Sequence, residues 1–274
     1  MSLRIALRTV SDSAFGDRLK TALGLRAPKL VRPLSKAAAV SDLFPWRVDE
    51  TWDTRFDVIN IPSILFPEAM QSDAVTLYIF NANGKQTAKH RVNVPPATSV
   101  SLSLREMTES SAEYGCFACF HSATDHPELT TAGTMIADRN YVSFRRKDDS
   151  LWSYVHGNAN ALAETPGGAL TALTGRPAHS YVYRPQIEFD DCRRFELIYI
   201  NPLDRDARLS VCLLNADRTE IMKLDNVIPP RGVRVIPVDN NEHRCHMIEN
   251  HGNVPDWRPT IFKFYDSHFD VLHS

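Results

Sequence analysis

The sequence predicts an all-β protein made of two tandem, related antiparallel β-sandwich domains (jelly-roll/Ig-like), preceded by a short N-terminal helix. Two observations lead to this fold class. Residues 74–104 align without a gap to residues 208–238, at a constant offset of 134, the difference between 208 and 74. In both copies apolar and polar residues alternate, as a strand with one buried face requires.

Each copy reads as a strand, a turn and a second strand. In the first copy Val75, Leu77 and Ile79 occupy one face of a strand, and the second copy has apolar residues at the same positions. Residues 81–84 supply turn-forming side chains that reverse the chain into the next strand. The pair Pro95-Pro96 cannot donate backbone hydrogen bonds, so it marks a sheet edge or a strand start.

Weaker similarity with gaps sets the domain boundaries. Residues 56–64 resemble 195–203, and residues 117–122 resemble 262–267. The predicted segments are an N-terminal arm with a short helix (1–50), sandwich copy one (51–122), a connecting hairpin and Gly/Pro loop that contribute strands (123–190), and sandwich copy two (191–274). Val233 and Val235 add apolar residues to the outer face of copy two, which we expect another subunit to cover.

Composition restricts the class of partner and the compartment. A formal net charge of −2 argues against general nucleic-acid binding, although residues 1–50 carry nine basic against five acidic side chains. We expect no secretory leader and no membrane insertion, because no apolar run is long enough for either. The five cysteines lie mostly in apolar runs, which favours buried, reduced thiols and a cytoplasmic protein.

Residues 200–239 have the pattern of an Asn at a strand start, an acidic turn, an alternating strand, a charged turn and a Pro-initiated basic strand. This pattern resembles the soluble transducer proteins of microbial sensory rhodopsins, which are small antiparallel β-sandwich domains. Residues 60–104 resemble them less closely. The resemblance implies an oligomeric, non-catalytic binding or signalling domain, here in tandem duplicate.

The predicted ligand-binding residues lie where the two copies differ. Histidine and asparagine side chains at strand ends, together with aromatic rings in the connection, are the groups that such a site would use. They are His121, Asp125, His126, His156, Asn158, Trp152 and Tyr154. Histidines 121, 126, 156 and 251 would form a metal or acid–base site only if they converged between the two sandwiches.

A second cluster of possible ligands follows Asp239. On a helical turn His243 and His246 would share a face, with Glu249 one turn beyond and His251 close by. This spacing matches no established zinc motif, so a polar surface loop is the simpler interpretation. No cofactor is otherwise expected, and a divalent metal belongs only to the alternative of a metal-dependent enzyme.

The preferred hypothesis is a cytoplasmic, non-catalytic protein that binds a protein or a small ligand and self-associates as a homo-oligomer. One alternative is a metal-dependent enzyme of double jelly-roll type that uses the histidines. Another is a carbohydrate-binding module, because tryptophan and tyrosine rings in the connection could stack on sugars. Glycine-rich phosphate loops, nucleophile elbows and zinc-protease motifs are missing from the sequence. Their absence argues against a nucleotide-dependent enzyme, a hydrolase or a metalloprotease.

Overall fold

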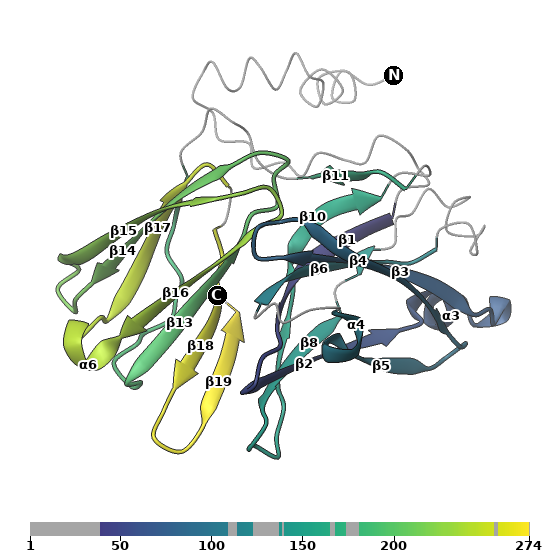
Figure 1. Cartoon of the computed structure of the whole chain (residues 1–274), viewed down its shortest axis with the longest axis horizontal. Coiled ribbons are helices and arrows are strands. Elements are labelled where there is room, and N and C mark those ends of the chain that lie inside the picture. Colours follow the sequence, from purple (N-terminus) through teal and green to yellow (C-terminus); the bar gives the residue numbers. More distant parts are fainter. Residues whose placement is uncertain are drawn as a thin grey trace, which may run out of the picture. The chain divides into compact units, whose positions relative to one another are not determined.

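The computed structural model describes residues 39–108, 114–122, 137–138, 140–164, 168–173, 181–254 and 257–273. They all belong to one compact unit, Arg32–Ser274. Strands dominate this part of the chain (Figure 1). The predicted N-terminal helix lies outside the described residues. In the described ranges the helical elements are α3 (Ile61–Leu65), η1 (Pro67–Ala69), α4 (Leu104–Met107) and α6 (Asn240–His243), and none of them is long and apolar enough to cross a membrane.

The strands of the first half form two sheets. The β1 sheet has seven strands in the order β11-β10-β1-β6-β3-β4, with β7 pairing to β1. Its strands are β1 (Ala39–Arg47), β3 (Asp73–Asn81), β4 (Gln86–Val94), β6 (Tyr114–Phe120), β7 (Ala137–Asp138), β10 (Asn158–Glu164) and β11 (Leu170–Ala172). The β2 sheet has the order β5-β2-β8-β9, built from β2 (Trp52–Ile59), β5 (Ser99–Ser103), β8 (Tyr141–Arg146) and β9 (Ser153–His156).

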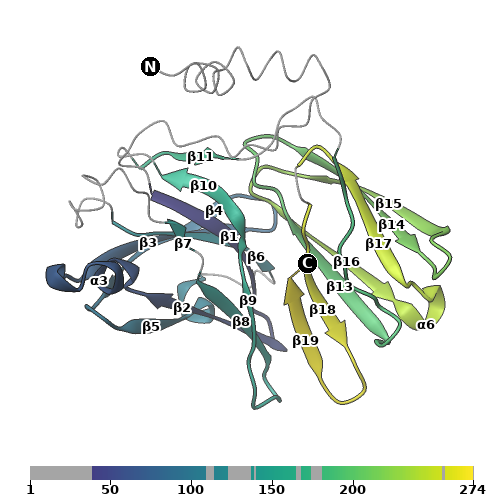
Figure 2. The same cartoon turned by 180° about the vertical axis from the view of Figure 1, so that it is seen from behind.

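The second half forms two sheets of four strands each. The β13 sheet has the order β16-β13-β18-β19, built from β13 (Arg194–Ile200), β16 (Val233–Asp239), β18 (Thr260–Phe264) and β19 (Phe269–His273). The β14 sheet has the order β12-β17-β14-β15, built from β12 (Tyr181–Tyr183), β14 (Ala207–Leu214), β15 (Glu220–Ile228) and β17 (Met247–Gly252). The hairpins β8–β9 and β18–β19 lie side by side in both views (Figures 1 and 2).

The two hairpins predicted from the sequence are built alike. Asp73 pairs with Val94 in β3–β4, and Ala207 pairs with Ile228 in β14–β15, so the register repeats at the predicted offset. Both turns close with the same hydrogen bond, from the fourth turn residue to the carbonyl of the opening asparagine, at 2.9 Å. That fourth residue is Gly84 in one turn and Arg218 in the other, and both have positive φ.

Strand β13 is buried on both faces and separates two hydrophobic cores. Its residues Ile198 and Ile200 join a first core that contains residues of β1, β2 and β6. Leu197 and Tyr199, on the opposite face, join a second core against β14. Alternate side chains of one strand point to opposite faces, so β13 can serve both cores at once.

The outer face of β16 is covered as predicted, but not by another subunit. Val233 is buried in the first core, and Val235 packs against it, so the first half of the same chain covers this face. Aromatic rings complete the contact: Trp52 meets Phe262 edge-on at 5.4 Å and Phe269 at 4.8 Å.

The predicted fold class was therefore wrong in its architecture. The protein is all-β, but its strands form four separate sheets and not two tandem β-sandwich domains. The β1 sheet and the β14 sheet also differ in size, because β3–β4 ends a seven-stranded sheet whereas β14–β15 ends a four-stranded one. The physical reason is the core shared by β13, which lets the second half bury apolar surface against the first.

All five cysteines are buried and free, as the sequence predicts. Burial raises the pKa of Cys192 to about 11 and that of Cys245 to about 12. At pH 8 the thiolate fraction of such groups is about one in a thousand or less. We therefore expect Ellman's reagent to react slowly with the native protein and to titrate five thiols after unfolding in guanidinium chloride. Rapid reaction of any thiol in the native state would contradict this burial.

Candidate functional site

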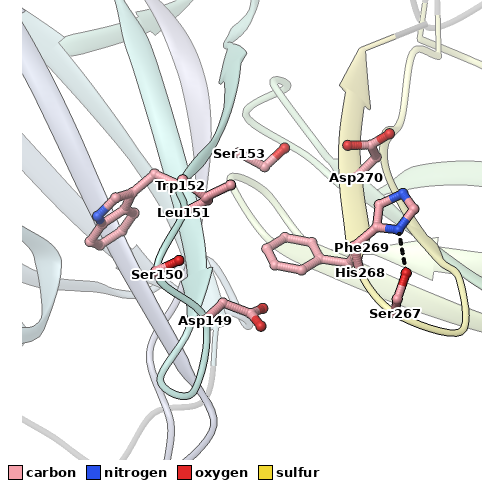
Figure 3. A pocket seen from close by; sticks show the side chains of 9 residues that line it. All are labelled: Asp149, Ser150, Leu151, Trp152, Ser153, Ser267, His268, Phe269 and Asp270. Carbon is pink, nitrogen blue, oxygen red and sulfur yellow. Dashed lines mark hydrogen bonds between the residues drawn. The ribbon is translucent and has the colours of Figure 1, made fainter.

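A cavity of about 410 Å³ lies between two chain segments that belong to different sheets (Figure 3). One wall is residues 149–153, which lead from β8 into β9 of the β2 sheet. The opposite wall is residues 267–270, which form the β18–β19 turn and the start of β19 in the β13 sheet. The cavity thus lies where the two halves of the chain meet.

The first wall is a turn held by local bonds. The amide of Asp149 donates to the carbonyl of Arg146 at 2.9 Å, and the Asp149 carboxylate pairs with the Arg146 guanidinium at 3.0 Å. The amide of Lys147 donates to the carbonyl of Thr51 at 2.8 Å, which ties the turn to the strand next to it. Beyond this turn the side chain of Leu151 is 79% exposed.

The second wall combines polar groups with a buried ring. The amide of Tyr265 donates to the carbonyl of His268 at 3.0 Å, and the two rings stack with centroids 4.5 Å apart. Ser267 Oγ lies 3.2 Å from His268 Nδ1, so the two polar side chains hold each other in place (Figure 3). Phe269 is buried against Trp52 and forms an apolar part of the lining.

The two walls are connected where β9 runs beside β19. Both are edge strands of their sheets. The amide of Val271 donates to Ser153 Oγ at 3.0 Å, and the rings of His156 and His273 lie 4.2 Å apart. The guanidinium of Arg258 lies 2.8 Å from His273 Nδ1. These contacts close the junction above the cavity, so its shape depends on the packing of β9 against β19.

The lining mixes hydrogen-bonding groups with apolar surface. Two carboxylates, Asp149 and Asp270, belong to opposite walls, and serine hydroxyls and the His268 imidazole also line the cavity (Figure 3). Leu151 and Phe269 supply the apolar part. Pockets that combine a few placed polar groups with apolar walls are typical of small-molecule sites.

Trp152 stands beside the cavity in a stack of charged and aromatic groups. The guanidinium groups of Arg55 and Arg145 each lie 4.7 Å from the centre of its ring. Arg55 also lies 5.6 Å from the Tyr154 ring and bonds its hydroxyl. Two cation–π contacts hold the indole away from the centre of the cavity (Figure 3).

The predicted ligand-binding residues are divided between different places. Trp152 lines the cavity, Tyr154 lies beside it and His156 lies on the β9–β19 junction. His121 is buried at the end of β6, where its Nδ1 contacts the carboxylate of Asp73.

The remaining predicted residues do not complete a histidine site in the described part of the chain. Asn158 begins β10, where its backbone pairs with Leu43. Asp125 and His126 lie outside the described residues. His251 contacts Glu249 at 2.6 Å in the β14 sheet.

The residues of the predicted metal site also separate. His246 lies between Asp190, at 2.5 Å from its Nδ1, and Glu188, at 3.8 Å from its Nε2. Glu249 instead contacts His251 and the guanidinium of Arg184. His243 ends the short helix α6. The helical turn assumed from the sequence ends at His243, and residues 247–252 form strand β17 instead.

The sequence did not predict several residues that line the cavity or that surround His246. Residues 267–270 read as an ordinary turn between strands, and no local pattern shows that this turn faces Leu151. Glu188 and Asp190 flank Phe189, and this acidic pair would have been the one available signal. Its partner His246 is 56 residues away from Asp190 in the chain, so sequence spacing cannot show the contact.

No protein-family model and no curated protein matches the chain. Among solved structures it is similar to a glycosyl hydrolase family 2 member from Bacteroides cellulosilyticus DSM 14838, with 10% identity, a TM-score of 0.15, and coverage of 85% of this chain and 28% of that one. A beta-glucuronidase from glycoside hydrolase family 2 gives 8% identity, a TM-score of 0.16, and coverage of 85% and 23%. The chain therefore spans less than a third of these proteins, and such low TM-scores support no conclusion about its fold or function.

Proposed function

We propose that this protein is a binding protein, and that it holds a small polar ligand in the cavity between residues 149–153 and 267–270. One observation carries the proposal: carboxylate, hydroxyl and imidazole groups surround the apolar surface of Leu151 and Phe269 in a single cavity. Such a lining can hydrogen-bond several groups of a ligand while packing against its apolar part.

A neutral carbohydrate has the chemistry that this lining favours. Its hydroxyl groups both donate and accept, so they can bond the carboxylate of Asp270 as well as the side chains of Ser267 and His268. Its C–H face can pack on Leu151, whose side chain is 79% exposed. A ligand with a strong negative charge is disfavoured, because Asp149 and Asp270 both line the cavity.

Tryptophan fluorescence can test this proposal directly. Trp152 is half-buried beside the cavity, whereas Trp46, Trp52 and Trp257 are buried in the cores. We expect a saturable change in emission when the full chain is titrated with a panel of neutral cello-, malto-, xylo- and galacto-oligosaccharides. The Trp152→Phe variant should lose the fluorescence change, while calorimetry should still detect binding.

The Asp270→Asn variant should bind the same oligosaccharide at least about tenfold more weakly, because hydrogen bonds to a charged group contribute about 1.5–3 kcal/mol. Asp266→Asn is the matched control, since Asp266 lies in the same turn but pairs with Arg193 outside the cavity lining. Binding that is equally strong in both variants, or no binding by any sugar of the panel, would count against the proposal.

Self-association and a cytoplasmic location stay predictions. In the described part of the chain β4 and β15 end their sheets, and both present outer edges. Strand β15 carries charged side chains, including Lys223 and Asp225. Charged side chains on an edge strand disfavour its nonspecific pairing with a strand of another chain.

A further inference from the structure

A second group of side chains, well separated in sequence from the cavity lining, converges on His246. Its Nδ1 lies 2.5 Å from Asp190 Oδ2, and its Nε2 lies 3.8 Å from Glu188 Oε1. One ligand atom from each of the three side chains lies within 4.8 Å of the other two. The carboxylates are 75% and 61% exposed and the imidazole is 18% exposed, so an ion from solvent can reach them.

The backbone places the two carboxylates on the same side of the chain. Phe189, between them, is buried and stacks on Phe195 with ring centroids 4.0 Å apart. Glu188 and Asp190, on either side of it, are exposed, and both carboxylates face the imidazole of His246. The amide of Phe189 donates to the carbonyl of His246 at 2.9 Å, which sets the imidazole beside both.

A buried asparagine fixes both segments that carry these side chains. Asn240 Nδ2 donates to the carbonyl of Phe189 at 2.7 Å, and its Oδ1 accepts from the amide of Cys245 at 2.7 Å. The amide of His246 donates to the carbonyl of Leu214 in β14 at 2.8 Å. The three side chains therefore project from backbone that is already positioned before any ion binds, which lowers the entropy that binding must overcome.

The local charges favour a cation. A neighbouring ammonium, Lys263 Nζ, lies 2.5 Å from the carboxylate of Asp191 and donates to the backbone carbonyl of Glu188 at 2.9 Å. Asp191 thus balances the charge of Lys263. Glu188 and Asp190 remain as two carboxylates beside one imidazole, and this charge matches that of a divalent ion.

We infer that Glu188, Asp190 and His246 form a binding site for a divalent transition-metal ion of the Zn²⁺ type. One imidazole nitrogen and two carboxylate oxygens are ligands that zinc accepts, whereas Mg²⁺ and Ca²⁺ prefer oxygen ligands alone. Three protein ligands leave at least one coordination position for water or for a group of a bound molecule. This inference is independent of the ligand proposed for the cavity.

Isothermal titration of zinc chloride into the full chain, freed of any histidine tag and stripped with EDTA, tests the site. We expect saturation at one zinc ion per chain and no comparable binding of magnesium chloride. Zinc should also raise the melting temperature, because an ion that binds only the folded state stabilises it. Titration without saturable zinc binding would overturn the inference.

Two variants and a matched control locate the ion. His246→Ala and Glu188→Gln should each weaken zinc binding by at least about tenfold, since even outer partners of metal ligands contribute that much. His243→Ala removes a nearby imidazole that is not in the cluster, and it should leave the affinity unchanged. Equal loss in His243→Ala and His246→Ala, or zinc binding that survives both cluster substitutions, would overturn the inference. If His246→Ala fails to fold, Glu188→Gln carries the test, because that side chain is 75% exposed.

Discussion

Trp52→Ala is expected to lower the free energy of unfolding by about 3–5 kcal/mol, the range for truncating a large buried aromatic ring. The indole is 3% exposed and meets the rings of Phe262 and Phe269 edge-on, so the substitution opens a cavity where the β2 sheet packs on the β13 sheet. The Arg47 guanidinium, 4.9 Å from the indole ring, would lose its cation–π contact as well. Denaturation in urea, followed by circular dichroism, measures the loss.

Trp52→Phe serves as the control, because it keeps an aromatic ring at the contact and should lose only about 1–2 kcal/mol. The wild-type protein should unfold in a single transition, since both cores share β13. Two separate transitions, of which Trp52→Ala shifts only one, would mean that the halves of the chain are independent domains and would contradict the shared core.

Gly84→Ala is expected to destabilise the protein by about 2–4 kcal/mol. Gly84 has a φ of 75°, where a residue with a side chain costs about 1–2 kcal/mol. A Cβ at this position would lie 1.8 Å from the carbonyl oxygen of Pro230 and 2.9 Å from the amide nitrogen of Gly232. Both atoms are backbone in the β15–β16 turn, so the two turns must separate to make room, and the bond from the Val233 amide to the carbonyl of Ala82 would weaken.

The second hairpin supplies a matched control for this substitution. Arg218 occupies the equivalent turn position with a φ of 61°, but it is exposed. Arg218→Gly should therefore be neutral or stabilise the protein by up to about 1 kcal/mol, because it removes strain at positive φ without any packing change. A Gly84→Ala variant as stable as the wild type would show that the β3–β4 and β15–β16 turns are not in contact.

The local features of the fold could be predicted with little more than the alternation of side chains. Val75, Leu77 and Ile79 are all fully buried in one strand, and the turn that begins at Asn81 reverses it into β4. Such patterns are readable because the contacts that produce them lie within a few residues. The same holds for the buried cysteines, whose apolar neighbours indicate a core position.

The candidate sites were only partly predictable. Trp152 and Tyr154 stand out as aromatic residues in a connection, and the structure places both at or beside the cavity. His246 stands out in a polar segment, but its partners Glu188 and Asp190 come from a segment before β13. Ligands that approach from distant parts of a chain leave no spacing pattern in the sequence.

The sequence by itself determined the all-β character, the two hairpins with their common register, and the positions that must be buried. Only the tertiary structure decided that four sheets share their cores, that Val233 is covered by the same chain, and that the turns at Leu151 and His268 enclose a cavity. The reason is that alternation specifies that a face must leave water, but it does not specify which surface will cover it. That choice depends on packing between segments far apart in the chain, such as Trp52 against Phe262.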